Sequence, residues 1–411
     1  MNEIDKMQED KNLKQGTLAS RNIRVLFWAE LFGSVRFIQP VLALFYFSRG
    51  LDEADILWLL LFWSIGVLVG EIPTGMFADR YGAKLSFVIG ALLSIVSHGL
   101  LIWAYDPWLF FASSLLSGFS VTFFSGADEA FIYESLKESN EENMLDKALG
   151  IIQSAQFMVM VVVLILGAII AKDLTDGQFK LLIGLGVFFQ IIQIVLLCFI
   201  KNPAGHGSYQ ENPFKQVKEG MLAIKKAPQL VWMFLNITLV FIPTVAIFNN
   251  FNDKLLRDAG LPVYLIGFVL AGLSIFSFFV SRSIGWMTSR ISRIALLYIT
   301  GGIAVFSLLL AAFFRETLWI LFIIMMLIHF VGAVRYPVYA QLANDIIPSN
   351  VRATTISLLS IIDSICDLVV FSSIASIAAF GFETMFLGAA VIAIIGSLLP
   401  IHPVTIRKNE S

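Results

Sequence analysis

Long apolar segments recur along the whole chain, and short polar turns separate them. Each segment runs for about 20 residues, the length that an α-helix needs to cross the hydrocarbon core of a bilayer. Of 411 residues, 58% are hydrophobic and only 14% are charged, whereas soluble domains average about 25% charged residues. A water-soluble core cannot hide so much apolar surface, so lipid must form part of the solvent. We therefore expect a multi-pass membrane protein.

Twelve spanning helices are expected, because hydropathy and turn residues divide the chain into that many segments. They fall near residues 22–47, 55–77, 85–104, 108–133, 148–171, 179–200, 229–250, 263–287, 294–314, 317–340, 353–380 and 384–402. The fold class is thus all-α integral membrane, with two pseudo-symmetric six-helix bundles at 1–200 and 229–411. The connection at 201–228 is a predicted cytoplasmic linker whose amphipathic run lies on the membrane surface.

The basic residues predict the orientation of the chain in the membrane. If the N-terminus is cytoplasmic, the inner loops hold 19 of the 28 Lys and Arg residues and the outer loops hold 6. Cytoplasmic loops carry an excess of positive charge in membrane proteins. We therefore expect a protein of the cell membrane with both termini in the cytoplasm.

The two halves of the chain carry a weak internal repeat. The segment Gly126–Leu136 aligns with Gly332–Leu342, and Gly, Ala, Ile or Val, Tyr and Leu recur at a constant offset of 206 residues. At this offset Glu129 corresponds to Arg335. A repeat half a chain apart is typical of transporters built from two related bundles.

A polar loop at 71–84 lies between the second and third apolar segments. It places five glycines and charged residues within ten positions: Gly75, Asp79, Arg80, Gly82 and Lys84. The charges cannot enter lipid cheaply, so the loop must lie at a membrane surface. We expect Gly75 to permit close helix approach and Gly82 to permit a tight reversal.

This spacing resembles the signature loop of the major facilitator superfamily, Gly-x-x-x-Asp-Arg-x-Gly-Arg-Lys, and departs from it at Ala83. The resemblance implies twelve helices and transport by alternating access. It also implies that Asp79 caps the start of the eleventh helix and latches the cytoplasmic side of the outward-open state. A carboxylate at an exposed helix N-terminus contributes about 0.3–1 kcal/mol, which suits a latch that must also release.

Ionisable residues within the spanning segments are the candidates for the transport site, because charge inside a membrane is costly and usually functional. The proton-coupling or substrate-cavity candidates are Glu30, Arg36, Asp128, Glu129 and Arg335. Glu129 is the first choice, since it lies on a stripe of small and polar residues along the helix expected at 108–133. The other members of the stripe are Ser114, Gly118, Thr122, Ser125 and Tyr133. The alternative is that these side chains hold neighbouring helices together. We expect Glu129 and Arg335 to approach each other when the protein opens outward.

Two features of the drug–proton antiporter branch of the resembled family are absent. The arginine expected four residues before Gly118 is Ser114, and the fifth helix has only Gly167 and no proline. These departures weaken the case for proton antiport, or they shift its machinery to the charged residues named above.

The predicted function is proton-coupled efflux of hydrophobic or cationic small molecules by a secondary active transporter. The alternative is transport of another solute, such as a siderophore, sugar or lipid, without obligatory coupling. A membrane sensor or enzyme is least favoured, because the chain lacks common nucleophile, metal and phosphate-loop motifs. We expect a monomer that handles a small-molecule substrate and protons within a lipid bilayer. No cofactor, metal, catalytic residue or nucleic-acid partner is predicted.

Overall fold

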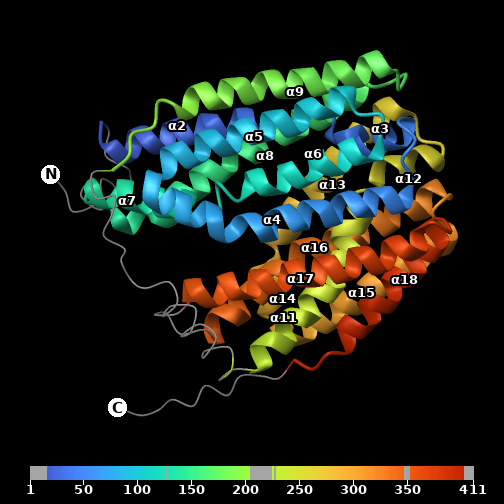
Figure 1. The fold of residues 1–411 in the computed structure, drawn as a ribbon. Helices are drawn as coiled ribbons and strands as arrows, with labels where there is room; N and C mark the ends of the chain where they lie inside the picture. Colours follow the sequence, from blue (N-terminus) through green and yellow to red (C-terminus); the bar gives the residue numbers. More distant parts are fainter. Residues whose placement is uncertain (1–15, 126, 204–224, 226–227, 347–351, 402–411) are drawn as a thin grey trace, which may run out of the picture. The chain divides into compact units, whose positions relative to one another are not determined.

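A computed structural model of the chain describes residues 16–125, 127–203, 225, 228–346 and 352–401 (Figure 1). Secondary structure in these ranges is entirely helical. The amphipathic run predicted in the linker lies outside the described residues. By their internal contacts, residues form two compact units. Unit 1 comprises residues 1–41 and 62–210, and unit 2 comprises residues 42–61 and 211–411.

The helices of unit 1, with α4 shared between the units, begin and end as follows: α2 (Leu18–Gly33), α4 (Glu53–Tyr81), α5 (Ala83–Trp103), α6 (Pro107–Val121), α7 (Ala127–Glu138), η2 (Glu142–Met144), α8 (Leu145–Ile170) and α9 (Asp176–Leu197). The short η1 (Gln39–Val41) follows α2. Helix α2 packs against α8 and α9, and α5 packs against α6 and α9 (Figure 1).

The helices of unit 2 begin with α3 (Leu42–Ser48) and then continue after the linker. They are α11 (Pro228–Phe241), η3 (Ile242–Ile247), α12 (Asn252–Asp258), α13 (Val263–Arg282), α14 (Ile284–Thr288), α15 (Arg293–Phe314), α16 (Leu318–Ile346), α17 (Arg352–Ala378) and α18 (Phe382–Leu398). Helix α15 packs against both α16 and α18. Residues 42–61, which the sequence assigns to the first half, cluster with unit 2; the predicted bundle boundaries stay a prediction.

The described residues contain nine helices that are long and apolar enough to cross a membrane. Three shorter apolar helices, at Gln39–Ser48, Pro107–Val121 and Phe382–Leu398, occupy the places of the first, fourth and twelfth predicted segments. The all-α membrane fold with twelve segments is therefore confirmed. The first and fourth segments are shorter because each of them is interrupted.

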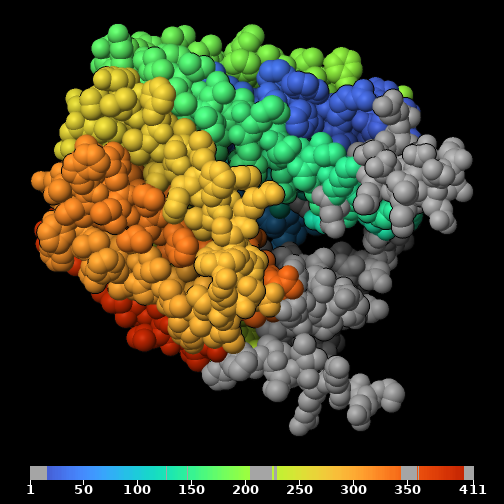
Figure 2. All heavy atoms as spheres, turned by 180° about the vertical axis from the view of Figure 1, so that it is seen from behind, coloured from blue at the N-terminus to red at the C-terminus, as the bar shows by residue number. Residues whose placement is uncertain are grey.

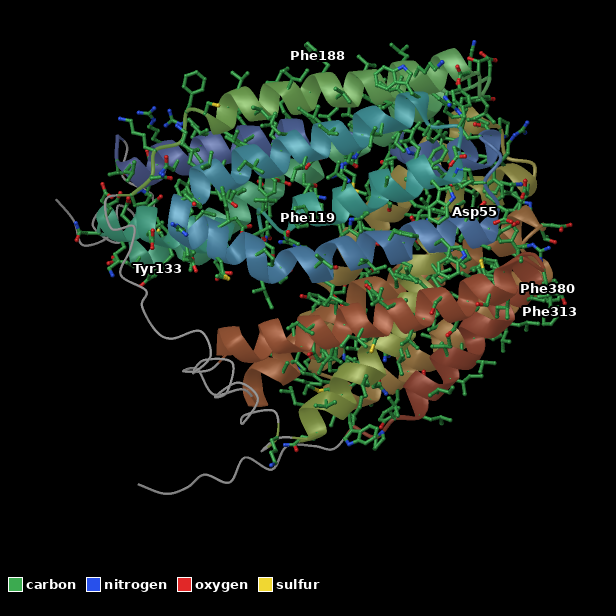
Figure 3. The ribbon with its side chains drawn as sticks, in the orientation of Figure 1. Asp55, Phe119, Tyr133, Phe188, Phe313 and Phe380 are labelled. Carbon is green, nitrogen blue, oxygen red and sulfur yellow. The ribbon has the colours of Figure 1, made fainter. Side chains whose placement is uncertain are left out.

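Large apolar side chains cover the outside of the helices. Phe188 on α9 and Phe313 on α15 project outward (Figure 3), and both are more than half exposed. Helix α8 likewise exposes Phe157, Met158 and Val162 along the teal-to-green band of Figure 2. Lipid tails are as apolar as these side chains, so the pattern fits helices whose outer faces contact a bilayer.

Local sequence signals set several helix ends. Asp106 caps α6 by accepting a hydrogen bond from the Trp108 N–H, and Pro107 occupies the first turn. Helix α9 begins with a capping box, in which Thr175 and Gln178 each satisfy a backbone N–H of the other. These ends lie close to those that the breakers in the sequence predict.

The predicted signature loop at 71–84 is much shorter in the structure. Helix α4 continues through Pro73 to Tyr81, and α5 begins at Ala83. The reversal therefore falls on Gly82 alone, whose φ of +87° favours glycine, as predicted. A Cβ added at Gly75 would meet no atom within 4 Å in the described structure, and the close helix approach expected there stays a prediction. The sequence misleads here because polar residues at a membrane surface are compatible with helix as well as with turn.

The fourth predicted segment, 108–133, is also not one helix. Helix α6 ends at Val121, turns follow, and α7 begins at Ala127. The polar stripe through Thr122, Ser125 and Glu129 therefore does not form a single helix face, and this part of the prediction is wrong. The backbone carbonyl of Thr122 instead accepts a 2.8 Å hydrogen bond from the Thr74 hydroxyl of α4.

Candidate functional site

The first spanning segment, predicted as a continuous helix over 22–47, is broken in its middle. Helix α2 ends at Gly33, residues 34–38 are not helical, and the chain resumes helical turns at Gln39. Non-helical backbone at membrane depth is tolerated where it is buried in protein or lines a polar cavity. Such interruptions also expose backbone groups near the binding sites of transporters. The break therefore marks the first place to look for a site.

Glycines on neighbouring helices make room for the break. A Cβ on Gly167 of α8 would collide with the Phe37 carbonyl oxygen and with Pro40. A Cβ on Gly33 would likewise collide with the side chain of Gln193, which reaches over from α9. Gly167 thus permits a close approach of α8 to the backbone of the break that a larger residue would prevent, whereas the flexible Gln193 side chain could shift to admit a Cβ at Gly33.

A cavity of about 500 Å³ opens beside the break within unit 1. Polar side chains from six helical elements and the break line much of it: Glu30, Ser34, Arg36, Gln39, Ser94, Ser120, Gln156 and Gln193. Apolar side chains complete the wall: Ala91, Val121, Phe124, Met160, Val163 and Leu164. Its volume lies in the range of about 300–1,000 Å³ that is usual for small-molecule sites.

Glu30 and Arg36 bring opposite charges to this cavity. Glu30 lies in the last turn of α2 and accepts a 3.1 Å hydrogen bond from the Ser34 hydroxyl. Arg36 lies on the non-helical segment and is exposed. Among the described side chains, no carboxylate lies within 4.0 Å of its guanidinium. A spacing of six along a continuous helix would have separated these residues, and the break brings them to one cavity.

A hydrogen-bonded cluster of Gln190, His98 and Ser94 lies next to Arg36, and its Ser94 also lines the main cavity. The Gln190 amide lies 3.1 Å from His98 Nδ1 and donates to Ser94 Oγ at 3.3 Å. His98 Nδ1 also lies 2.8 Å from the Ser94 carbonyl. Arg36, His98 and Gln190 together line a second, small apolar pocket. The cluster contains no carboxylate to pair with Arg36, and its Gln190 Oε1 has no hydrogen-bond partner among the described residues. Arg36 also lines the main cavity.

Asp128 and Glu129, the candidates from the fourth segment, do not line this cavity. Both begin α7 and both are exposed. The Asp128 carboxylate accepts a 2.8 Å hydrogen bond from the Glu129 N–H. This arrangement resembles a helix N-terminus stabilised by acidic residues. Helix α7 is held in place by Asn22 of α2, which donates to Ser135 at 3.0 Å.

Arg335 of α16 is fully buried within unit 2. Its guanidinium donates to the carbonyls of Leu297 and Asn236, to the Asn236 side chain and to the Thr300 hydroxyl. It therefore ties α16 to α15 and α11 without a carboxylate. Its Nε has no hydrogen-bond partner in the described part of the chain. The predicted approach of Glu129 and Arg335 stays a prediction.

The charged residues of the predicted latch lie near the Gly82 reversal. Asp79 and Arg80 are exposed, and the Arg80 guanidinium lies 5.4 Å from the Tyr81 ring centroid. Lys84 Nζ donates to the Cys198 carbonyl at 2.6 Å. Lys84 thereby joins the start of α5 to the end of α9. The latch role of Asp79 stays a prediction.

A buried acid that the sequence analysis missed lies in unit 2. Asp253 of α12, a short helix between two spanning segments, is 5% exposed and accepts a 3.0 Å hydrogen bond from the Leu44 N–H of α3. Burial raises the pKa of its carboxyl to about 7, although backbone hydrogen bonds oppose the rise. Lys254, the next residue, pairs with Asp258 instead. Asp253 thus fastens α3 to α12.

Several cavity residues also escaped the sequence analysis. Gln156, Gln193 and Ser94 carry neutral amides and a hydroxyl, whereas the predicted candidates are all ionisable. The sequence does contain a feature that could have identified two of them, because Gln156 and Gln193 are polar residues within otherwise apolar segments. The sequence could not show that α8 and α9 bring them to the same space as Glu30.

Comparison with known proteins shows the same family along most of the chain. The family model described as Major Facilitator Superfamily matches residues 31–370. The MFS-type transporter YxaM of Bacillus subtilis (strain 168) is 24% identical over 403 residues, which cover 90% of this chain and 93% of that protein. The multidrug resistance protein MdtH of Salmonella typhimurium is 26% identical over 161 residues, 38% of this chain and 36% of that one.

Solved transporter structures share the fold. The nucleoside transporter NupG has a TM-score of 0.72 at 13% identity, with 92% of this chain and 97% of that chain covered. The D-xylose–proton symporter has a TM-score of 0.66 at 14% identity, with 93% and 96% covered. The family model, the similarity to YxaM along the full length and the shared fold agree with the signature loop at Gly82: this chain belongs to the major facilitator superfamily.

Proposed function

We propose that this transporter exports small molecules bearing a positive group in exchange for protons, with Glu30 as the group that both compete for. The observation that carries the proposal is the position of the Glu30 carboxylate. It faces a cavity of about 500 Å³, and the one hydrogen bond it receives in the described structure comes from Ser34. A carboxylate so placed can hold a proton or a cationic group but not both at once, which is the requirement for exchange.

The surroundings of Glu30 support this role. Phe124, Met160, Val163 and Leu164 supply apolar surface to the cavity wall, and apolar surroundings strengthen the attraction between a carboxylate and a cation. The break after Gly33 gives this part of the chain a site at which conformation can change. Of the predicted candidates, Glu30 and Arg36 alone line the cavity, and the proposal rests on these two. The partial similarity to MdtH, a multidrug resistance protein, is in keeping with export.

A second candidate function is transport of a neutral, hydroxyl-rich solute. The amides of Gln39, Gln156 and Gln193 favour it, because amides both donate and accept hydrogen bonds. The nucleoside transporter and the D-xylose–proton symporter that share the fold point the same way. Such a solute would use the amides for binding and leave Glu30 to the proton alone.

Transport by purified protein in proteoliposomes with an imposed pH gradient tests both candidates. We expect ethidium to cross the membrane in the direction opposite to the protons. In Glu30→Gln, we expect the rate of ethidium transport no longer to depend on the pH gradient. Glu316→Gln, an exposed carboxylate on unit 2, is the matched control. Uridine and D-xylose measured in the same vesicles test the second candidate. Ethidium movement that ignores the gradient would rule out proton exchange.

A further inference from the structure

The cavity in unit 1 contains two charged side chains, Glu30 and Arg36, and together they indicate which ligands it can bind. Arg36 contributes a permanent positive charge, since a guanidinium stays protonated in proteins. No described carboxylate lies within 4.0 Å of it. A charge at membrane depth is costly unless it pairs or serves a ligand. The cavity therefore holds one positive and one negative group, neither of which is paired directly with the other.

The backbone keeps these two charges apart. Glu30 lies on the last turn of α2, and Arg36 lies within the break that Gly167 fixes against α8. The Ser34 hydroxyl lies between them in sequence and binds Glu30. The neighbouring cluster of Gln190, His98 and Ser94 offers Arg36 no carboxylate, and its Gln190 Oε1 has no hydrogen-bond partner among the described residues. The two ionic groups thus form the two ends of a prepared site.

We propose that the cavity binds small bipolar molecules, with a positive group at Glu30 and a carboxylate at Arg36. This inference rests on the proposed function and specifies its substrate class. A monocation would pair with Glu30 but would be repelled by Arg36. A monoanion would pair with Arg36 but would be repelled by Glu30. A bipolar ligand pairs both. The guanidinium presents two parallel N–H groups that match a carboxylate, which favours that anion over a simple point charge.

The remaining lining defines the body of the ligand. Gln39, Gln156 and Gln193 can bind polar groups between the charges. Val163, Leu164 and Phe124 accept an apolar chain or ring. A zwitterion carries no net charge, so a cavity with one Glu and one Arg can accept and release it without moving net charge into lipid-bounded space.

Binding to full-length protein in nanodiscs tests the proposal with a chain-length series of probes. The zwitterions are the ω-amino acids from glycine up to aminooctanoate, and each is compared with the alkylammonium and the alkanoate of the same length. We expect an optimal length at which the zwitterion binds at least about tenfold more tightly than either matched ion, because each ion loses one charge-assisted contact. A series in which an ion binds as tightly as the zwitterion, or in which no zwitterion binds, would overturn the proposal.

Variants test which charged group of the ligand binds to Glu30 and which binds to Arg36. Arg36→Gln should abolish the preference for zwitterion over alkylammonium, and Glu30→Gln should abolish the preference over alkanoate. Arg36→Lys should retain part of it, because the charge remains and the paired N–H geometry is lost. Arg282→Gln and Glu316→Gln, both exposed on unit 2, are the controls and should leave the preference intact. Unaltered preference in Arg36→Gln would contradict the proposal.

The outcome is separable from that of the proposed function. If ethidium exchanges with protons but the zwitterion series shows no preference, proton-coupled export stands and the bipolar site fails. If the zwitterions bind with the expected preference but no probe follows the pH gradient, the site stands and proton coupling fails.

Discussion

Arg36 in unit 1 and Arg335 in unit 2 are both arginines within spanning segments, yet their surroundings are opposite. Arg36 is exposed on a non-helical segment, next to a cavity and without a carboxylate within ion-pair distance in the described structure. Arg335 is fully buried and donates to acceptors on α11 and α15. Membrane location alone therefore does not identify a transport residue. What decides is whether neighbouring helices already satisfy the charge.

Arg335→Leu should give the largest loss of stability. The leucine removes hydrogen bonds to Asn236, Leu297 and Thr300 and leaves buried polar atoms without their donor. Bonds to charged groups contribute about 1.5–3 kcal/mol each in net terms, so we expect a loss of at least about 3 kcal/mol. Thermal unfolding of purified protein, followed by intrinsic fluorescence, measures it. A variant as stable as the parent would show that Arg335 is not structural.

Gly167→Leu should have the next largest effect, because its side chain would collide with Phe37 and Pro40 at the break. Overpacking of this kind costs about 1–3 kcal/mol. We also expect reduced ligand binding, since the break positions Arg36. Gly184→Leu is the control, because a Cβ there meets nothing within 4 Å. Equal effects at the two glycines would disprove a specific role of α8 in holding the break.

Asp253 predicts a pH dependence of stability that belongs to unit 2. Its folded pKa of about 7 lies above the ordinary value of 3.8, so the folded state holds a proton that the unfolded state releases between these values. Stability contributed by the protonated group is complete below about pH 4, falls as pH rises and is fully lost above about pH 7. The slope is at most about 1.4 kcal/mol per pH unit.

Unfolding curves of Asp253→Asn from pH 4 to pH 8 test this prediction. The variant should lack the component of the parent's pH dependence that lies between about pH 4 and pH 7. Asp258→Asn, on the same helix but exposed and paired with Lys254, should retain it. Identical pH profiles of Asp253→Asn and the parent would contradict the burial of an acid at this position.

Arg36→Gln should have the smallest effect on stability and a large effect on transport. Its guanidinium has no described ion pair to lose, and exposed substitutions usually change stability by less than about 0.5 kcal/mol. We expect uptake or efflux of the best bipolar probe to fall at least about tenfold, measured in proteoliposomes. If Arg36→Gln were strongly destabilised but transported normally, Arg36 would be a structural residue like Arg335, and the prediction would be wrong.

Prediction from sequence succeeded where a short stretch of chain carries the information. Apolar length located the spanning segments, and the spacing around Gly82 identified both the family and a tight reversal that φ confirms. Ionisable residues in apolar segments pointed to Glu30 and Arg36 among several others. Prediction from sequence failed at the breaks in the first and fourth segments. Hydropathy depends on the residues alone, so it is the same whether a segment is helical or unwound.

Some properties of this protein depend on single residues and their neighbours in sequence, and others depend on packing between distant parts of the chain. Membrane class, helix lengths and family depend on transfer of side chains from water to lipid and on local turn geometry, which residues carry individually. The break beside Gly167, the shared cavity of Glu30 and Gln193, and the burial of Arg335 depend on contacts between residues far apart in sequence. Only the packed helices decide which charges meet a partner in the protein and which stay available to a ligand.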